Sequence, residues 1–444
     1  MAFVSEYRID MRRLNSLLRN PHFSVLASVL YVLSRLYNSV GQPIGVFPDS
    51  ASYLRLSFTG DAERMWPVPA VFSALQADST RILANIAIGS AAWIFMAFTL
   101  ARQSRYPRAV FTAVLLLGLS PQIIRYDLAL LSESLGITFA IVLVVTSLRI
   151  AKEQTTPNLM LWIAAFVLCV MTRPTHLIIA VACALVSIAV FVQSRGKRMV
   201  FATPALILLL VWGYATVNNN RSVSNLNMYT VLMDQVLRDD SQYGWFVQHG
   251  MPDIAGIREV QGYDYVGTLP MELVNIINLS PDQAPPAIIR HGGSELAIWV
   301  KDHGWSTYVR WVASHPSDAV QIVTQRADFT LSPPNDDFLP LQVNYILPRW
   351  LFGSWIIWGT LGCGAMGLLL LQPATRKTGK TLVFMACTTG VVFAASVTTS
   401  GIEHQRHSVT VAVIIRVLAL CAIVSVMPKR FTRKPAESDV SPSQ

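Results

Sequence analysis

Runs of mostly apolar residues that are long enough to cross a lipid bilayer recur along this 444-residue chain, and they constrain its fold more than any other feature. A helix needs about 17–25 such residues to span the hydrocarbon layer. Hydrophobic residues make up 52% of the sequence and charged residues only 14%, against roughly a quarter charged in soluble domains. The sequence therefore predicts an all-α polytopic membrane protein.

The apolar runs, each bounded by polar ends, predict about ten transmembrane helices. The predicted spans lie at about 22–40, 81–101, 109–124, 128–148, the two halves of 158–193, 199–217, 350–371, 381–400 and 408–427. Residues 41–80 form the first external loop between spans one and two. The one long polar region, 218–349, has helical periodicity in places and predicts an α-rich external cap between spans seven and eight.

Short basic clusters between alternate apolar runs give the orientation, because cytoplasmic loops carry an excess of Lys and Arg. By this rule residues 1–21 and the basic tail 428–444 are cytoplasmic, with spans one to seven in 22–217 and spans eight to ten in 350–427. No cleavable signal peptide or organelle signal is apparent, which predicts the bacterial cytoplasmic (plasma) membrane. The basic residues do not form one patch, so we expect no nucleic-acid partner.

Ionisable side chains, which are unusual near the membrane interior, lie at the outer ends of several predicted spans. They are Asp49, Asp127, Glu133, Arg173, His404, Arg406 and His407. Arginine binds a phosphate through two donors, histidine binds or protonates one, and a carboxylate takes a proton from an attacking hydroxyl. The combination indicates glycosyl transfer from a lipid-phosphate sugar.

Four short motifs give the chain a resemblance to the GT-C fold glycosyltransferases, covering about 1–217 and 345–427. They are an acid on a short surface helix in the first external loop (Asp49), a Ser-Glu start to span four (Glu133), an Arg-Pro break (Arg173) and Glu-x-x-Arg-His before the last span (Arg406 and His407). The resemblance implies a polyprenyl-phosphate-linked sugar donor and a glycan or lipid acceptor, with membrane lipids around the spans.

The resemblance also implies roles for individual residues. Asp49 corresponds to the catalytic base, and Asp127 and Glu133 are the candidates for a second acid. Arg406 corresponds to the arginine at the donor phosphate, where Arg173, His404 and His407 would assist. Many members carry a soluble C-terminal domain, whereas the bulk of the polar sequence here lies between spans seven and eight. We therefore expect acceptor specificity in the cap, with Tyr53, Trp245 and Trp305 as candidate acceptor-side residues.

Plainer interpretations stand beside these roles. Asp49 is also suited to cap the helix that follows it, and Arg173 to reach lipid headgroups. The cap aromatics also suit a core or an interfacial belt. Arg35 and Arg416 lie within predicted spans and need a partner, with Glu133 one candidate acid.

No metal or cofactor is expected at the predicted site. The paired acids at 239–240 and 336–337 resemble metal ligands, but pairs of this kind in polar loops are usually solvated. A lipid-phosphate donor is already activated, and no Gly-rich phosphate loop is apparent.

Two rival functions remain open at the level of sequence. An O-antigen-type polymerase or ligase with a lipid-diphosphate donor would use cap residues such as Arg290, His291 or His315 and tolerate loss of Asp49. A lipid or sugar transporter would need internal repeats and ionisable groups near the membrane midplane, and inspection finds neither.

Overall fold

A computed structural model describes residues 21–47, 49–56, 58, 64–176, 179, 213, 221–254, 257–261, 295–332, 341–344, 347–401 and 403–427. Within these residues the chain is helical, and the one β-type pairing is an isolated bridge between Gly45 and Ala129. Predicted spans six and seven lie almost wholly outside the described residues. So do most of segment 1–21, the tail 428–444, the acids at 336–337, and Arg290 and His291.

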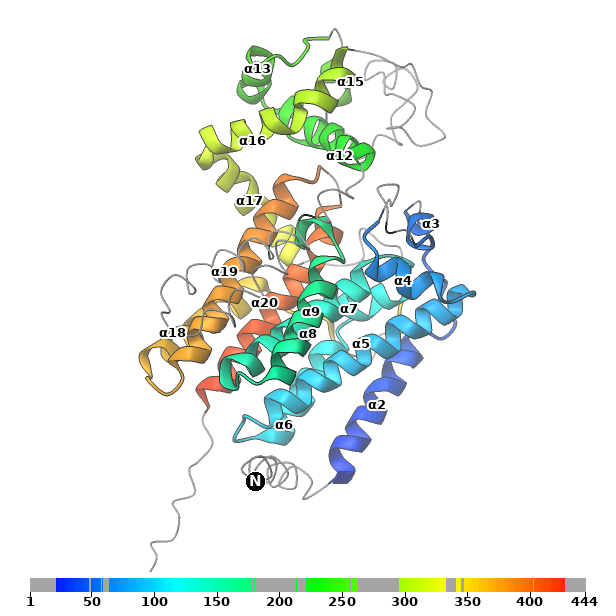
Figure 1. Cartoon of the computed structure of the whole chain (residues 1–444), viewed down its shortest axis with the longest axis vertical. Coiled ribbons are helices and arrows are strands. Elements are labelled where there is room, and N and C mark those ends of the chain that lie inside the picture. The colour runs from blue at the N-terminus through cyan, green and yellow to red at the C-terminus, as the bar shows by residue number, and fades with distance from the viewer. Residues whose placement is uncertain are drawn as a thin grey trace, which may run out of the picture.

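The helical bundle occupies the lower part of Figure 1. Its helices are α2 (Pro21–Ser39), α5 (Asp78–Ala101), α6 (Pro107–Gly118), α7 (Pro121–Ile124), η1 (Arg125–Leu128), α8 (Glu133–Lys152), α9 (Thr156–Val170), α18 (Trp355–Leu371), α19 (Arg376–Thr398) and α20 (His404–Val426). Short helices α3 (Ser50–Tyr53) and α4 (Pro67–Ser73) lie between α2 and α5, and 3-10 turns occur at η2 (Pro174–His176) and η7 (Arg349–Leu351).

Four described helices, α5, α8, α19 and α20, are long and apolar enough to cross a membrane. The segment Pro107–Gly118 with Pro121–Leu128 adds a fifth if this pair, bent by 51°, is one span. Helices α9 and α18 are apolar but shorter, with 15 and 17 residues. These helices are those of a polytopic α-helical membrane protein, and the number ten stays a prediction.

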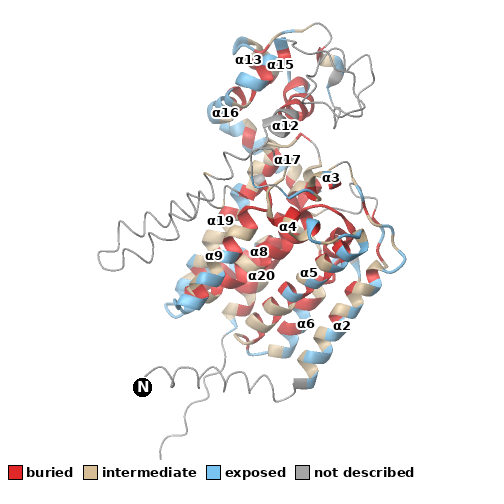
Figure 2. Ribbon diagram, turned by 45° about the vertical axis from the view of Figure 1, so that its right-hand side comes forward, coloured by how far each residue is buried: buried red, intermediate tan, exposed pale blue. Residues whose placement is uncertain are grey.

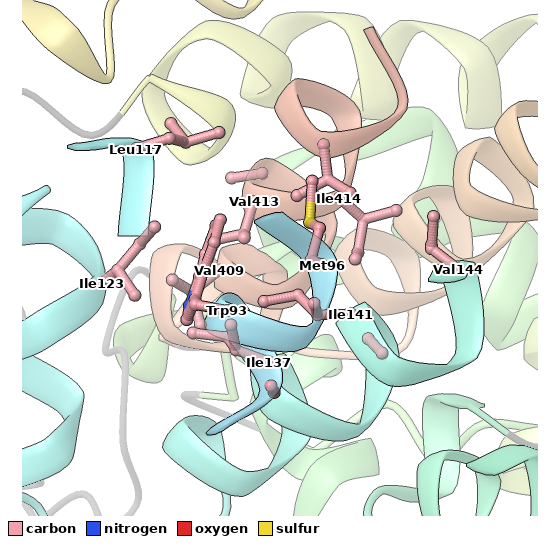
Figure 3. Close-up of a cluster of buried hydrophobic side chains, with 14 of the residues drawn as sticks. Trp93, Met96, Leu117, Ile123, Ile137, Ile141, Val144, Val409, Val413 and Ile414 are labelled. Atoms are coloured by element: carbon pink, nitrogen blue, oxygen red, sulfur yellow. The ribbon is translucent and has the colours of Figure 1, made fainter. Parts of the chain in front are cut away.

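Helix α20 is the centre of the bundle, where it packs against α8, α17, α18 and α19. Figure 3 shows Val409 and Val413 of α20 beside Ile137 of α8 and Trp93 of α5. All four side chains are buried. This packing fixes how the first turn of α20 faces the neighbouring segments, and that turn holds the predicted donor-binding residues His404, Arg406 and His407.

Two helices expose apolar faces that water would not favour. In α2, Val25, Leu26 and Leu33 are more than half exposed, while Tyr31 and Arg35 on the other face are buried. Figure 2 shows exposed residues of α2 in pale blue. Helix α18 exposes a similar set, with Leu371 at 75%. Faces of this size and polarity are covered by lipid in membrane proteins, which gives α2 and α18 a lipid-facing position.

Above the bundle in Figure 1 lies a second group of helices, which we call the cap. It comprises α12 (Arg221–Asp234), η3 (Val236–Arg238), α13 (Asp240–Gln248), η4 (Ile257–Val260), α15 (Glu295–Trp299), the π-helical turn η6 (Val300–Gly304), α16 (Trp305–Ser314) and α17 (Pro316–Leu331). The cap has its own buried core, which includes Tyr229, Phe246, Tyr308 and Trp311. Helix α17 leads from the cap to the bundle and packs on α19 and α20.

Candidate functional site

Arg406 lies in the first turn of α20, and its guanidinium is in contact with three carboxylates from different parts of the chain. Its Nε donates to Oε1 of Glu133 at 2.6 Å, and its Nη1 donates to Oε2 of Glu403 at 2.6 Å. Its Nη2 donates to Oδ2 of Asp49 at 3.3 Å. The start of α8, the start of α20 and the loop before α3 therefore meet at one buried arginine.

Arg173 and His407 extend this cluster on one side. Nη2 of Arg173 lies 3.3 Å from Oε1 of Glu133 and 2.9 Å from Nδ1 of His407. A guanidinium nitrogen can only donate, so Nδ1 of His407 accepts and the imidazole proton is on Nε2. That Nε2 lies 3.9 Å from Oε2 of Glu403. Nη1 of Arg173 also donates to the backbone oxygen of Arg406 at 3.3 Å, which connects the η2 turn to α20.

Asp49 is the accessible acid of the cluster. Its side chain is 40% exposed, and its Oδ2 lies 3.0 Å from Nη2 of Arg64. Although Asp49 occupies the N-cap position of α3, its side chain makes no capping hydrogen bond, so the capping interpretation does not describe its contacts. Arg64 also donates from Nε to Ser52 at 2.8 Å and lies over the ring of Tyr53, 5.0 Å from its centroid.

Glu133 is fully buried at the start of α8 between the guanidinium groups of Arg406 and Arg173. Its second oxygen, Oε2, has no hydrogen-bond partner within the described part of the chain. A carboxylate buried this deeply is costly unless positive charge lies next to it. Glu133 therefore fixes the two arginines in place while keeping one oxygen free.

Glu403 completes the cluster with a strained backbone. Its φ of 52° lies in the left-handed region, which costs a residue other than glycine roughly 1–2 kcal/mol. Burial raises the pKa of its carboxyl above the ordinary value, the charge of Arg406 opposes this, and the nearby carboxylates of Asp49 and Glu133 add to the rise. Such strain in a partly buried acid is typical of functional sites.

We call this set the Arg406 cluster. It consists of Asp49, Arg64, Glu133, Arg173, Glu403, Arg406 and His407. Sequence reasoning did not mention Arg64, and it included Glu403 only as the first residue of the Glu-x-x-Arg-His motif, without a role of its own. Arg64 lies in an unremarkable polar loop, so no local signal marks it. Glu403 stands three residues before Arg406, and that helical spacing was the signal available for their contact.

Asp127 lies outside this cluster, in a separate buried network. Its carboxylate accepts hydrogen bonds from Nε of Arg35 at 3.0 Å and from Nη2 of Arg35 at 2.8 and 2.6 Å. It also accepts one from the hydroxyl of Ser134 at 2.7 Å. Arg35 therefore pairs with Asp127 and not with Glu133. Gly89 makes room for the guanidinium, since a Cβ there would lie 2.9 Å from Nη1 of Arg35.

His404 also points away from the Arg406 cluster. Its Nε2 lies 2.9 Å from Nη1 of Arg326 and 3.4 Å from Oδ2 of Asp234, both residues of the cap helices. Tyr53, a predicted acceptor-side residue, is buried and donates to Ser132 just before α8 at 3.2 Å. Tyr53 thus ties α3 to the start of α8.

The predicted aromatic residues of the cap pack against cap side chains. Trp245 stacks on His249 with ring centroids 3.7 Å apart, and Trp305 meets Tyr308 edge to face at 6.0 Å. His315, which one rival function would use, stacks on Trp311 at 5.6 Å. These contacts agree with the core interpretation of the cap aromatics.

Arg416 is buried in the middle of α20 and contacts backbone oxygens. Its guanidinium donates to Phe352 at 2.6 Å, Gly353 at 2.6 Å, Ala412 at 2.6 Å and Leu331 at 3.0 Å. The carbonyls of Leu331 and Ala412 belong to helices α17 and α20. Arg416 therefore joins the end of α17 to the bundle through backbone oxygens.

An apolar cavity of about 490 Å³ lies between α8, α9, α19 and α20. Its lining runs from Lys377 and Thr155 at one end to Thr410 and His176 at the other. His176 is only three residues from Arg173, so the cavity approaches the Arg406 cluster from within the bundle. Among the described residues no group of three His, Cys, Asp or Glu side chains is arranged to hold a metal ion.

No protein-family model matches the chain, and no curated protein matches its sequence. One solved structure with a similar course is the archaeal oligosaccharyltransferase AglB from Archaeoglobus fulgidus, in complex with an inhibitory peptide and a dolichol-phosphate. The identity is 11%, the TM-score is 0.43, and the match covers 90% of this chain. The chain spans about half the length of that protein, since the match covers 50% of it.

Proposed function

We propose that this protein is a membrane glycosyltransferase that moves a sugar from a polyprenyl-phosphate donor to a glycan or lipid acceptor on the external side of the membrane. The observation that carries the proposal is the contact of Arg406 with both Asp49 and Glu133. It joins a half-exposed carboxylate, suited to act as a base, to a buried arginine, suited to bind a phosphate. Lipid-phosphate glycosyl transfer needs both groups within one site.

The donor phosphate would take the place of the Asp49 carboxylate on the arginines. Of the carboxylates that Arg406 contacts, Asp49 has the longest contact, at 3.3 Å, and the most exposed side chain. Arg64 and Arg406 both contact its Oδ2, so a single phosphate at that position would be bound by two guanidinium groups. Binding would thereby release Asp49 at the position where the acceptor hydroxyl must arrive.

The reaction would then be a single displacement at the anomeric carbon. The carboxylate of Asp49 takes the proton of the acceptor hydroxyl while the acceptor oxygen forms its bond to the anomeric carbon. The bond from that carbon to the phosphate oxygen breaks, and its electron pair stays on the polyprenyl phosphate, whose charge Arg406 and Arg64 stabilise. Attack from the side opposite the leaving group inverts the anomeric configuration.

The remaining members of the cluster support this chemistry. Glu133 and Arg173 hold Arg406 from the bundle side, and His407, with its proton on Nε2, is available as a hydrogen-bond donor. The cavity between α8, α9, α19 and α20 would take the polyprenyl chain, because its lining is apolar and it ends near Arg173. The external position of the cluster and the cytoplasmic termini rest on the distribution of basic residues. The ten spans rest on the lengths of the apolar runs, and the bacterial cytoplasmic membrane rests on the targeting signals of the sequence.

Transfer of radiolabelled sugar tests the proposal. Membranes that contain the wild type, Asp49→Asn or the control Asp78→Asn receive a labelled polyprenyl-phosphate sugar and a cell-envelope acceptor fraction. We expect Asp49→Asn to lose about 10²–10⁴-fold in transfer rate, as the loss of a general base predicts. Asp78 is a half-exposed acid like Asp49, but it pairs with Arg81 at the start of α5 and lies outside the Arg406 cluster, so its variant should keep the wild-type rate. Equal transfer by Asp49→Asn would remove the mechanism, and no transfer by well-expressed wild type would remove the donor class.

A further inference from the structure

The turn between α19 and α20 is in contact with the cap through the backbone of Gly401. A Cβ added at this glycine would lie 2.0 Å from the backbone oxygen of Thr230 in α12. No side chain fits at such a distance, and the obstacle is backbone that cannot rotate away. The amide of Gly401 also faces the hydroxyl of Thr230, at 3.3 Å. Position 401 is therefore a close helix-to-turn contact that only glycine allows.

Cap side chains also bind the last carbonyls of α19, which have no partner within the helix. The hydroxyl of Tyr308 donates to the oxygen of Thr398 at 2.7 Å, and Gln235 donates to the same oxygen at 3.4 Å. Nη1 of Arg326 donates to the oxygen of Val397 at 3.4 Å. The cap thus fixes the end of α19 as well as the turn that follows it.

A charged network fixes the beginning of α20 in the same way. Asp234 of α12 receives Nη2 of Arg326 at 2.5 Å and faces Nε2 of His404 at 3.4 Å. Burial alone would raise the pKa of Asp234, but the contact with His404 and the charge of Arg326 lower it below the usual value. Asp234 therefore remains ionised near neutral pH and holds the first residue of α20 against the cap.

We propose that the cap positions Arg406 for phosphate binding, with Gly401, Asp234 and His404 as positioning residues. Glu403 lies two residues after Gly401 and directly before His404, and its left-handed backbone persists only where neighbouring contacts enforce it. When the contacts between the cap and this turn are lost, the backbone of Glu403 leaves the left-handed conformation, and its carboxylate loses its hydrogen bond with Nη1 of Arg406. This inference takes the identity of the ligand, a polyprenyl phosphate, from the proposed function. The coupling between the cap and Arg406 does not depend on that function.

Hydrogen exchange tests the coupling without any catalysis. The amides of residues 403–407 are followed by mass spectrometry in nanodiscs for the wild type, Gly401→Ala and Gly390→Ala. Gly390 lies in α19, and a Cβ there meets nothing within 4 Å, so it is the matched control. We expect faster exchange in Gly401→Ala and wild-type exchange in Gly390→Ala. Unchanged exchange in a folded Gly401→Ala protein would overturn the proposal.

Binding of polyprenyl phosphate tests whether the coupling passes through Arg406. We expect Asp234→Asn to weaken this binding about tenfold, and Asp240→Asn, which alters an acid that is 91% exposed, to leave it unchanged. Arg406→Lys should weaken binding, and adding Asp234→Asn to it should then have less than about a twofold further effect. A full tenfold further loss in the double variant would overturn the role of Asp234 in positioning Arg406.

The two sets of results separate this inference from the proposed function. Wild-type protein that binds no polyprenyl phosphate and transfers no sugar removes the proposed function. The exchange of residues 403–407 in Gly401→Ala still decides whether the cap holds the turn. Normal donor binding and transfer in Gly401→Ala would leave the proposed function standing and remove the positioning role.

Discussion

The side chain of Arg406 shows how one residue organises the site. Its three nitrogens each address a different carboxylate, and each carboxylate comes from a different segment. Because Glu133 and Glu403 hold two of the nitrogens at 2.6 Å, the guanidinium has a defined orientation before any ligand arrives. Only the nitrogen that faces Asp49 is directed toward an accessible group.

Replacement of Arg406 by lysine keeps the charge but removes this planar arrangement of donors. A charge-assisted hydrogen bond contributes about 1.5–3 kcal/mol, so loss of one predicts a rise of about 10- to 100-fold in the KM for the donor. The KM for the acceptor should change little. Initial rates measured over a range of each substrate test this. An unchanged donor KM would contradict the role of Arg406.

The raised pKa of Glu403 predicts a stability effect with a definite sign. The folded state binds a proton more tightly than the unfolded state, so ionisation of Glu403 destabilises the fold as pH rises from about 4.3 through the folded pKa. The side chain in Glu403→Gln cannot ionise. The difference between the thermal midpoint of this variant and that of the wild type should therefore rise with pH over this range. Melting curves between pH 4 and pH 7 test the prediction. A difference in thermal midpoint between variant and wild type that does not change with pH would count against it.

At the scale of helices, the Arg35–Asp127 pair joins α2 to the turn η1 before α8. Both side chains are almost fully buried, and the guanidinium contacts both carboxylate oxygens. The pair gives an otherwise lipid-facing helix one specific contact with the bundle interior. It therefore has a structural explanation that does not require catalysis by Asp127.

Removal of one member of this pair should destabilise the protein. Asp127→Leu leaves Arg35 buried without its partner, for which we expect a loss of about 3–5 kcal/mol. The double variant with Arg35→Met should recover most of it, since an apolar pair of similar volume often replaces a buried ion pair. Thermal unfolding in detergent measures both. A stable double variant that transfers no sugar would instead support a catalytic Asp127.

The whole molecule brings the cap, the Arg406 cluster and the apolar cavity into one arrangement. Gly401 and Asp234 connect the cap to the turn before α20, and the first turn of α20 holds Arg406. The cavity extends from His176, near Arg173, to Lys377 at the far end of the bundle. The cap therefore contacts the turn before α20, while the cavity approaches the Arg406 cluster from within the bundle.

Filling the cavity should discriminate between donors by chain length. Thr389 lines the cavity, whereas a Cβ at its neighbour Gly390 meets open space. Thr389→Trp should lower the transfer rate with a long polyprenyl donor about tenfold or more, and a donor with a short chain should be used as by the wild type. Gly390→Trp is the control. Equal loss with both donors would show that the cavity does not hold the chain.

Local patterns in the sequence were sufficient for the broad architecture. Composition and the length of apolar runs indicate a polytopic helical protein, and the helical periodicity near Tyr229 and Tyr308 indicates an α-rich cap whose core contains both residues. The positions of α5 and α20 also agree closely with predicted spans, whereas the predicted span at 109–124 is divided between α6 and α7. These features depend on neighbouring residues only, so a single sequence reveals them.

Partners across the fold could not be read in the same way. Sequence reasoning placed Asp49, Glu133, Arg173, Arg406 and His407 at one end of the spans, and the structure joins them. It gave no partner to Arg35 and named Glu133 as one candidate. It grouped Asp127 with the catalytic acids and His404 with the donor-phosphate residues.

The sequence by itself determined a membrane-embedded helical chain with ionisable groups at the ends of its spans, because hydrophobicity and helical period are local properties. Only the tertiary structure decided that Arg406 meets Glu133, 273 residues away, that Asp127 belongs to Arg35, and that His404 faces the cap. Each of these pairings depends on how helices rotate and approach one another. That geometry follows from packing over the whole molecule and is not written in any one segment.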